Sequence, residues 1–562
     1  MQLNKLTEKL LFVPLGGSGE IGMNLNLYHY KGKWIMVDCG TGFAEERIMP
    51  GVDIIVPDIS FIIDNKIKIE AIIITHAHED HVGAVPHLWE YCSDAPVYAT
   101  PFTAHFLKTK LTDFGLQDKV KIKVVTQNRA KFKIADFNIE MIGLTHSIPE
   151  MRAIYIKTDA GNILHTGDFK IDKTPIVGEV SDEERLKQIG DEGVMAVVCD
   201  STNVFSDGWS GSEGDIEDNL VELIKDAKQC VVVTTFASNV ARVQTIANAA
   251  KRCGRQIILS GTSLHRISGI AKKVGYLEDV SFVDAKDFDD KNRHKILIIA
   301  TGCQGEPLAT VAKLSGGTHP FLKIKNGDKV IFSSKIIPGN EKKIAATLNR
   351  LADMGVEIVT ERNAKIHVSG HPNRDELKHL YELVRPAIAI PVHGEAIHIN
   401  EHCKWAKSDC GVKNTISVRN GHVLCFENGN SVKKIGEVEA DYLGVEGNLF
   451  HSPGGEVMKM RRRMKGGVIV CSFALNGKGG IACSPRIVAM GSLDSENEKD
   501  FIKEMEQKVA KNLKEKAPAF FAAKNKTKLH SEITNLAKGT LAQMVKRELK
   551  TTPMIEIMMM LV

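Results

Sequence analysis

The heptapeptide THAHEDH, residues 75–81, places three histidines and two acids directly after the apolar run AIII (71–74). A single histidine near a strand end is usually a hydrogen-bonded structural residue. Three within six residues, with Asp80 between the second and the third, supply the imidazole and carboxylate ligands that divalent transition ions favour. The pattern predicts a metal site where a buried strand reaches a polar edge of its sheet.

Three further candidate ligands follow apolar strands elsewhere in the chain. His146 ends FNIEMIGLTH, Asp168 ends NILHTGD and His393 ends AIAIPVH. Taken singly, each residue could equally well make a structural hydrogen bond or bind a metal. Because parallel neighbouring strands end at the same edge of a sheet, we expect these residues to converge. The combined set is large enough for two divalent ions bridged by one carboxylate: His76, His78, Asp80, His81, His146, Asp168 and His393.

The hydrophobic pattern changes along the chain. Residues 10–200 consist mainly of short apolar strands, with one amphipathic helix expected at about 82–91. Between about 215 and 365, strands such as CVVVTTF and KILIIATG alternate with helical stretches, which is typical of a parallel sheet of βαβ units. The gap of 225 positions between Asp168 and His393 then makes this segment an insertion, if both residues bind one metal pair.

A third unit is predicted beyond residue 453. It contains the strand GGVIVCSFAL, two charged helices at about 496–516 and 530–550, and the terminal run PMIEIMMMLV, which we expect to be a buried strand. The basic run KMRRRMK (459–465) is either a solvated connector into this unit or an RNA contact. We favour the connector, because no aromatic residues are interleaved for base stacking.

Size and composition set broader limits. A chain of 562 residues predicts three or four domains, and 43% hydrophobic with 25% charged residues is typical of a globular protein. The net charge of +4 argues neither for nor against a nucleic-acid partner. Eleven cysteines without a CxxC pair favour reduced thiols and a cytoplasmic protein. The chain lacks the run of ~20 apolar residues that spans a membrane, so no membrane partner is expected.

Ordered motifs resemble a known superfamily. IMVDCG, HAHEDH, LTHS and HTGDF are similar to the series that defines the metallo-β-lactamase fold. The closer resemblance, dense over residues 10–450, is to the ribonuclease J family in the β-CASP branch. The stretches that carry it are LFVPLGGSGEIGMN, PGVDIIVPD, CDSTN, TGCQGEP, IIPGNE, HVSGHP and PVHGE.

The resemblance implies a fold and its domains. We expect an α/β protein with a metallo-β-lactamase αββα sandwich, an inserted β-CASP α/β domain and a small C-terminal α+β domain. The sandwich would comprise residues 1–208 and 372–450, the insertion 209–371, and the linker with the C-terminal domain 451–562. GGSG (16–19) lacks the lysine and helix of a phosphate loop, so we interpret it as a tight turn below the site.

The resemblance also implies metal ligands. His76, His78 and His146 would bind one Zn²⁺ of each subunit, and Asp80, His81 and His393 the other, with Asp168 as the bridge. Mn²⁺ or Mg²⁺ are alternatives in vivo. Asp38 would orient a ligand imidazole, although strand-end capping explains it equally well.

Further residues are implied in catalysis and in substrate binding. His371 would be the general acid that protonates the departing 3′ oxygen, and Asp200 would hold its imidazole; Asp80 is counted with them as a catalytic metal ligand. The loop His367, Val368, Ser369, Gly370 and His371 would receive the 5′ phosphate of RNA. Weaker candidates for backbone contacts, equally suited to N-cap or turn roles, are Ser333, Asn340, Ser238 and Asn239.

The implied activity is that of a ribonuclease. We expect 5′→3′ exonuclease activity on single-stranded 5′-monophosphorylated RNA, together with endonuclease activity, in mRNA decay and RNA maturation, by a homodimer or homotetramer. DNA is the main alternative substrate, because β-CASP proteins act on both polymers. A hydrolase of small molecules is a weaker alternative because the insertion and the SGH loop (369–371) argue against it. A non-catalytic RNA-binding subunit is also weaker, because all seven ligand positions are filled.

Overall fold

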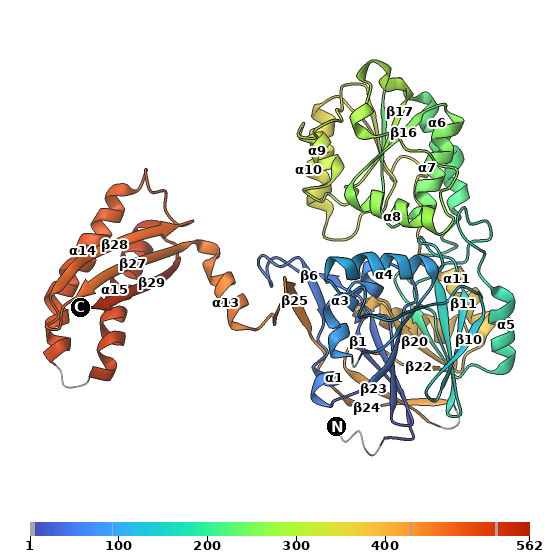
Figure 1. Ribbon diagram of the computed structural model, residues 1–562, viewed down its shortest axis with the longest axis horizontal. Coiled ribbons are helices and arrows are strands. Elements are labelled where there is room, and N and C mark those ends of the chain that lie inside the picture. The colour runs from blue at the N-terminus through green and yellow to red at the C-terminus, as the bar shows by residue number, and fades with distance from the viewer. Residues whose placement is uncertain (1–5, 93, 428–429, 523–525) are drawn as a thin grey trace. The chain divides into compact units, whose positions relative to one another are not determined.

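The computed structural model describes residues 6–92, 94–427, 430–522 and 526–562. Its contacts divide the chain into two units, one of residues 1–42 and 55–442 and the other of residues 43–54 and 443–562. Figure 1 shows the chain from its blue N-terminal strands to its red C-terminal helices.

Two sheets form the centre of the first unit. The eight-stranded sheet has the order β24-β23-β1-β3-β4-β7-β8-β9. Its strands are β1 (Leu10–Gly16), β3 (Leu25–Tyr30), β4 (Lys33–Val37), β7 (Ile69–Ile73), β8 (Val97–Ala99), β9 (Ile122–Val124), β23 (His422–Glu427) and β24 (Ser431–Glu437). The seven-stranded sheet has the order β10-β11-β12-β13-β14-β20-β22. Its strands are β10 (Ala130–Ile134), β11 (Phe137–Gly143), β12 (Arg152–Thr158), β13 (Gly161–His165), β14 (Ala196–Asp200), β20 (Ile388–Val392) and β22 (Asn414–Thr415).

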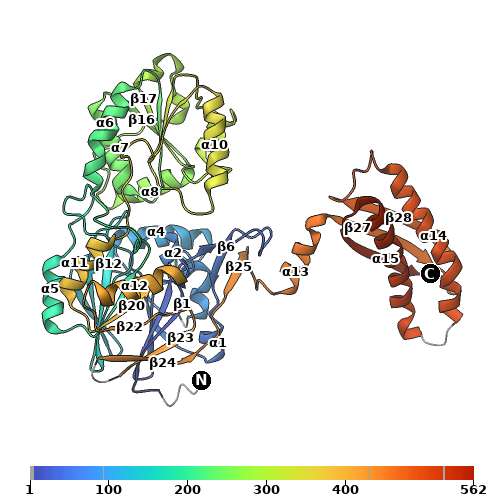
Figure 2. The same cartoon turned by 180° about the vertical axis from the view of Figure 1, so that it is seen from behind.

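The core lies between these sheets. Phe12 and Ile73 from the first sheet pack in one buried cluster with Ile154 and Ile390 from the second. The outer face of the seven-stranded sheet forms a second cluster with three helices, α5 (Glu183–Glu192), α11 (Arg374–Val384) and α12 (Ala396–Ser408). Figure 1 shows α1 (Ser60–Asp64), α3 (Val85–Leu88) and α4 (Pro101–Asp113) beside the other sheet, and Figure 2 shows α1 and α4 there from behind. The expected αββα layers are confirmed.

A separate parallel sheet is inserted into this sandwich. β14 pairs in parallel with β20, from Ala196↔Ile388 to Asp200↔Val392, although residues 201–387 separate the two strands in sequence. The intervening chain builds a five-stranded sheet of order β16-β17-β15-β18-β19. Its parallel strands are β15 (Val231–Thr234), β16 (Gln256–Ser260), β17 (Ile296–Ala300), β18 (Lys329–Phe332) and β19 (Glu357–Val359).

The helices of the insertion alternate with its strands, as the sequence predicts. They are α6 (Glu217–Asp226), α7 (Val240–Arg252), α8 (Thr262–Lys273), α9 (Thr310–Ser315) and α10 (Glu341–Asp353). The central strands are buried on both faces, which explains their continuous β-branched runs. The insertion is confirmed, while the boundaries at 208, 371 and 450 stay predictions.

The second unit has a small α+β core. Its sheet has the order β28-β27-β29, with β27 (Val468–Leu475), β28 (Ile481–Met490) and β29 (Met554–Leu561). Helices α14 (Lys499–Ala522) and α15 (Lys526–Leu549) share one buried cluster with the sheet. Short strands outside these sheets are β2 (Ser18–Gly19), β5 (Gly42–Phe43), β6 (Ile54–Pro57), β21 (Gly394–Glu395), β25 (Tyr442–Glu446) and β26 (Leu449–His451).

The basic run lies in the connector α13 (Glu456–Arg463) and the turn that follows it. Arg461 pairs with Glu446 and donates to the Pro50 carbonyl at 3.1 Å, and Lys465 donates to the Glu46 carbonyl. These guanidinium and ammonium groups are therefore used in contacts within their own unit, in agreement with the connector interpretation. Within the described ranges, no helix is long and apolar enough to cross a membrane.

Two sequence predictions were wrong in detail. The helix expected at 82–91 is broken into α2 (Glu79–Val82), α3 and a 3₁₀ turn, because the Ala84 N–H donates to the Cys39 carbonyl instead of to the preceding turn and Pro86 has no N–H to donate. The terminal run does form a strand, but only one of its faces is covered. Ile555 is 6% exposed whereas Met558 is 62% exposed, because strand side chains alternate and the helices pack against one face.

Candidate metal centre

The predicted ligands gather where strands of the sandwich end. Asp38 follows β4, His146 follows β11, Asp168 follows β13 and His393 follows β20. The histidine cluster comes directly after β7 and leads into α2. Asp38 and His393 have φ values of 63° and 50°, a left-handed backbone conformation that is uncommon outside glycine and that concentrates at functional sites.

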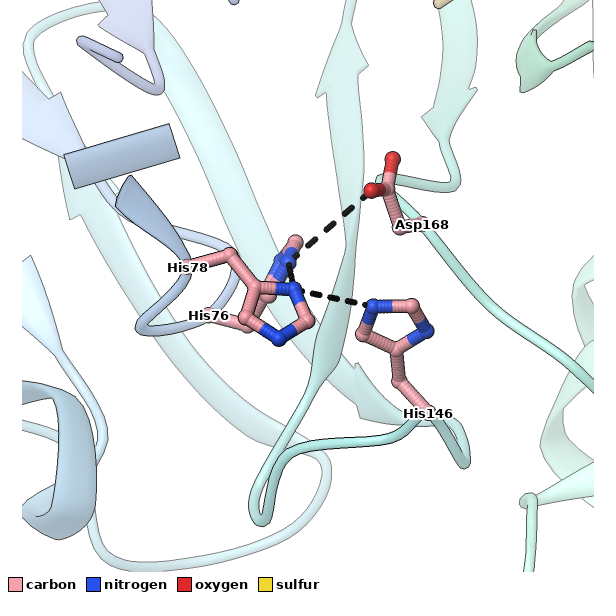
Figure 3. A group of neighbouring side chains, drawn as sticks. All are labelled: His76, His78, His146 and Asp168. Carbon is pink, nitrogen blue, oxygen red and sulfur yellow. Dashed lines mark hydrogen bonds and ion pairs between the residues drawn. The ribbon is translucent and has the colours of Figure 1, made fainter. Parts of the chain in front are cut away.

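The first group of ligand atoms comes from three imidazoles and a carboxylate. His78 Nδ1 lies 3.0 Å from His76 Nε2 and 3.1 Å from His146 Nε2. Figure 3 shows these three rings directed toward one another, with Asp168 beside them. All the ligand atoms of the group lie within 4.8 Å of one another.

The second group shares Asp168 with the first. Its other members are Asp80, His81 and His393. His81 Nε2 lies 3.1 Å from Asp168 Oδ2, and His393 Nδ1 lies 3.3 Å from Asp168 Oδ1. Asp168 Oδ1 is buried and has no hydrogen-bond partner in the described part of the chain. The structure thus brings all seven predicted ligands together in the predicted grouping, with one carboxylate common to both.

Several side chains hold the imidazoles in place. The buried Asp38 accepts from His81 Nδ1 at 2.8 Å and from the backbone N–H of Thr75 at 2.8 Å. The Thr75 hydroxyl also lies 3.0 Å from His76 Nδ1. Asp38 therefore directs His81 Nε2 toward Asp168, which is the orienting contact expected from the sequence.

Two further contacts were not expected from the sequence. The Asn24 amide contacts His393 Nδ1 at 2.8 Å, and the backbone N–H of His393 donates to the Gly17 carbonyl at 2.6 Å. Gly17, in the GGSG turn, has φ 79°, and an added Cβ would meet the Asn24 side chain at 2.2 Å. Asn24 ends the stretch LFVPLGGSGEIGMN, but the stretch does not show its role, because that role depends on a neighbour 369 positions away.

The three imidazoles of the first ligand group are in the protonation state that suits a cation. Burial lowers the pKa of His76 and His146 well below the usual range, and it lowers that of His78 to about 4. These imidazoles are therefore neutral near pH 7, the form that binds metal ions. Burial opposes ionisation of Asp168, but the neighbouring His393, His81 and His371 hold the pKa of its carboxyl well below its usual range.

His371 lies against the shared carboxylate and against Asp200. Its Nδ1 is 2.7 Å from Asp200 Oδ2 and 3.9 Å from Asp168 Oδ2. Although burial opposes the charged form, Asp200 and Asp168 raise the pKa of His371 to about 9. Asp200 is buried, and its other oxygen accepts from the backbone and the hydroxyl of Thr202. The predicted pair is thus in direct contact, beside the candidate metal ligands.

The loop that precedes His371 joins this pair to the first ligand group. The Gly370 carbonyl accepts from His146 Nδ1 at 2.6 Å. Asn203, in the CDSTN motif, donates to Ser369 Oγ at 2.8 Å and to the His371 carbonyl at 3.1 Å. Burial lowers the pKa of His367 to about 3, so it is neutral near pH 7. The sequence singled out the loop but not its support by Asn203.

Four family models match the chain in order. They are described as Metallo-beta-lactamase superfamily (24–180), Ribonuclease J, beta-CASP domain (228–351), Zn-dependent metallo-hydrolase RNA specificity domain (355–417) and Ribonuclease J C-terminal domain (456–562). The fold class expected from the sequence is thereby confirmed.

Whole-chain relatives agree with these matches. Proteins named Ribonuclease J are 40% identical in Sinorhizobium meliloti (87% of each chain) and 36% identical in Thermus thermophilus (83% of this chain, 82% of the relative). The Synechocystis protein of that name is 32% identical over 100% of this chain and 88% of its own. A crystal structure of a protein of unknown function from Enterococcus faecalis is similar in fold, with TM-score 0.51 and 17% identity over 74% of this chain and 100% of that chain.

Arg242 is a further residue that the sequence did not single out. Its side chain is fully buried in α7 and forms a bidentate ion pair with Glu213, at 2.8 and 2.9 Å. It also donates to the Ser333 carbonyl at 2.7 Å, and at 3.4 Å to the carbonyls of Ile366 and Val368. Arg242 therefore ties the inserted sheet to the segment that leads into His371.

The weaker substrate candidates lie around this network or at turns. Asn239 accepts from the Arg242 backbone N–H as the N-cap of α7, and Ser333 Oγ donates to the Ile366 carbonyl. Asn340 donates to Gln304 at 3.4 Å, and the Ser238 carbonyl accepts from the Val240 N–H. These are contacts within the protein, and RNA contacts for these residues stay predictions.

Replacing Arg242 tests the network. We expect Arg242→Met to lower the free energy of unfolding by about 3–5 kcal/mol, because Glu213 is left as an unpaired buried charge. Arg252→Met is the matched control on the same helix. Arg252 and its partner Asp218 are exposed and its other partner, Glu217, is partly exposed, so the change should be small. Chemical denaturation measures both. Adding Glu213→Gln to Arg242→Met should recover part of the loss, and the absence of recovery would contradict the assigned ion pair.

Proposed function

Because the chain belongs to the ribonuclease J family and is therefore a metal-dependent nuclease, we propose that it is a two-zinc ribonuclease with both exonuclease and endonuclease activity. The exonuclease mode degrades 5′-monophosphorylated RNA in the 5′→3′ direction. The observation that supports this most directly is the geometry around Asp168, which is shared by two ligand groups and lies beside the His371–Asp200 pair.

The donor atoms fit two divalent ions of borderline softness. Each group offers imidazole nitrogens and carboxylate oxygens without a thiolate, which suits zinc or manganese. Asp168 Oδ1 is buried and accepts no hydrogen bond from the described residues, although His393 Nδ1 lies 3.3 Å away, so it is an acceptor that a cation would satisfy. We assign His76, His78 and His146 to one ion, and Asp80, His81 and His393 to the other. Asp168 bridges them.

Each protein group has a definable task in phosphodiester hydrolysis. Two closely spaced ions, when bound, supply an activated water and stabilise negative charge on the phosphate oxygens. Asp200 holds His371 Nδ1, which leaves Nε2 to donate its proton to the departing 3′ oxygen. The pKa of about 9 keeps His371 charged before the reaction. Asp38 and the Gly370 carbonyl hold His81 and His146 in orientation.

The loop of residues 367–371 is the proposed seat of the 5′ phosphate. Ser369 and Gly370 are half-buried, and Asn203 orients the serine hydroxyl. The contact of Gly370 with His146 places this loop beside the first ligand group. A terminal phosphate held there would present the first internucleotide bond to the centre, so that mononucleotides are released.

RNA is favoured over DNA as the substrate. The match of residues 355–417 to an RNA specificity domain supports RNA, and it covers this same loop. We further propose that the enzyme acts in mRNA decay and RNA maturation in the cytoplasm, as a homodimer or homotetramer. End-labelled RNA and DNA of one sequence, assayed with and without chelator, test the substrate and its polarity.

The metal assignment predicts the behaviour of ligand variants. His76→Ala or Asp168→Ala should lose at least one ion and abolish cleavage. The fold should persist, because these ligands lie at strand ends outside the hydrophobic clusters. Elemental analysis and circular dichroism of the purified variants provide the measurement. His379→Ala, a partly exposed histidine on α11 paired with Glu183, is the control that should keep metal and activity. A fully active His76→Ala enzyme would rule out the two-ion centre.

The general-acid assignment predicts that a His371 variant keeps its metal content but loses cleavage rate. His371→Ala should keep both ions, because His371 is not a ligand in this scheme. Its single-turnover cleavage rate should fall by ~10²–10⁴-fold, as expected for a lost general acid. A fall in metal content that parallels the loss of rate would show that His371 has been misassigned.

The 5′-phosphate assignment predicts a selective defect. Ser369→Ala removes one hydrogen bond to a charged phosphate, of order 1.5–3 kcal/mol in the exonuclease reaction. Internal cleavage should be largely spared, and RNA with a 5′ triphosphate should be a poor exonuclease substrate because the pocket cannot seat the added charge and bulk. Rates on 5′-mono- and 5′-triphosphorylated RNA measure both effects, with the exposed Ser408→Ala as control. Equal rates on both ends, unchanged by Ser369→Ala, would exclude this role.

A further inference from the structure

A hollow lies at the carboxyl edge of the inserted five-stranded sheet. It is formed by the loops that follow β15, β16 and β17 and has a volume of about 320 Å³. Its lining includes none of the candidate metal ligands. In open parallel α/β sheets, ligands bind outside the carboxyl ends of the strands, and pockets of ~300–1,000 Å³ hold small molecules.

One residue that lines this hollow has a buried hydroxyl without a hydrogen-bond partner among the described residues. Thr235, which directly follows β15, is 1% exposed and lines the hollow. Its Oγ1 has no hydrogen-bond partner among the residues described. The neighbouring hydroxyls of Thr301 and Thr310 are instead bonded to each other at 3.3 Å. A buried hydroxyl in this state needs a ligand or a solvent partner.

The start of α8 adds backbone donors to the same hollow. This helix has twelve residues and begins at Thr262, and no side chain caps its first turn at Gly261. The exposed Thr262 and Ser263 line the hollow together with Lys313. The first N–H groups of a helix, its dipole and an ammonium group all favour an anion such as a phosphate.

The rest of the lining contains apolar and acidic side chains, which a site for phosphate alone would not need. Phe236 and Leu308, the latter 83% exposed, supply apolar surface. Glu306 is exposed, and one of its carboxylate oxygens accepts from the Gln304 N–H at 2.9 Å. A carboxylate beside an anion site would repel a second phosphate but can accept hydrogen bonds from sugar hydroxyls, as acidic residues do in dinucleotide-binding sheets.

We propose that this hollow binds one ribonucleotide 5′-phosphate, at a site separate from the metal centre. The phosphate lies at the start of α8 and accepts from Thr235, the ribose hydroxyls contact Glu306, and the base packs on Phe236 and Leu308. The same chemistry is offered by a free nucleoside monophosphate and by one nucleotide of an RNA chain. Binding here does not depend on the proposed cleavage reaction.

The test uses full-length protein in which the proposed cleavage site cannot contribute. Adenosine 5′-monophosphate is titrated calorimetrically, in chelator, into the His76→Ala, Ser369→Ala double variant. We expect one saturable site per chain. Adding Ser263→Glu should weaken binding at least ~10-fold while the helix stays folded, because a negative charge at its start stabilises the helix but repels phosphate. Thr235→Val, which keeps the side-chain shape, should weaken binding by about 3–10-fold.

Lys273→Glu is the matched control. It changes the charge of the same helix by two units at its opposite end, about 15 Å away by helix geometry. Its dissociation constant for the monophosphate should stay within about twofold of the double variant's. If Lys273→Glu weakens binding as much as Ser263→Glu does, the effect comes from the overall charge of the protein and the proposed site is wrong. No saturable binding in the double variant, or an unchanged constant with Ser263→Glu, would also overturn it.

A second arm identifies the source of the nucleotide. A 5′-hydroxyl hexanucleotide RNA is titrated in competition with the monophosphate. Competition that is weakened by Ser263→Glu assigns the site to the RNA chain, and the absence of competition assigns it to free nucleotide. Cleavage by the otherwise unmodified enzyme is assayed separately, so a failure of the proposed ribonuclease function stays distinguishable from a failure of this site.

Discussion

The parallel pairing of β14 with β20 is the contact on which the candidate centre depends. It aligns Asp200 with Val392 and so brings His393, the next residue, to the strand end that also carries Asp168. The insertion returns to the sandwich just before α11, and for that reason His371 reaches Asp200. The pairing joins two parts of the sandwich that are separated by an entire folded sheet.

The charge balance around Asp168 follows from that convergence. Burial of neighbouring imidazoles and carboxylates in one place is costly unless each charge is compensated. The pKa of the Asp168 carboxyl lies well below its usual range because His393, His81 and His371 lie close to it, although burial opposes its ionisation. Burial keeps His76, His78 and His146 neutral. Neutral imidazole nitrogens and a shared carboxylate, that of Asp168, are the kinds of ligand that a pair of divalent cations requires.

The insertion is held to the reactive loop by buried polar contacts. Arg242 connects Glu213, on the outgoing chain, with the carbonyls of Ile366 and Val368 on the returning chain. A guanidinium with five donors can hold several backbone segments at once, which a hydrophobic contact cannot do with the same directionality. The loop of residues 367–371 is therefore positioned from the inserted sheet as well as by Asn203.

The sequence alone determined the chemistry of the centre and the order of its domains. Ligand-grade residues at strand ends, as in THAHEDH and PVHGE, are local patterns that alternating hydrophobicity makes visible. Local patterns also predicted the inserted α/β sheet and the terminal strand. They failed where the backbone departs from a simple repeat, at Ala84 and Pro86, and where burial depends on which face a helix covers, as for Met558.

Only the tertiary structure decided which residues support the site. Arg242 and Glu213 lie outside the motifs, and although Asn24 and Asn203 lie inside LFVPLGGSGEIGMN and CDSTN, those stretches do not show what the two side chains contact. Each of the four acts through a partner far away in sequence. The roles of Asp38 and of the turn at Gly17 likewise depend on which neighbour the fold supplies. A sequence shows which groups can bind a metal or a proton. Which of these groups are held in place depends on hydrogen bonds between distant segments, and those bonds form only when the sheets have paired.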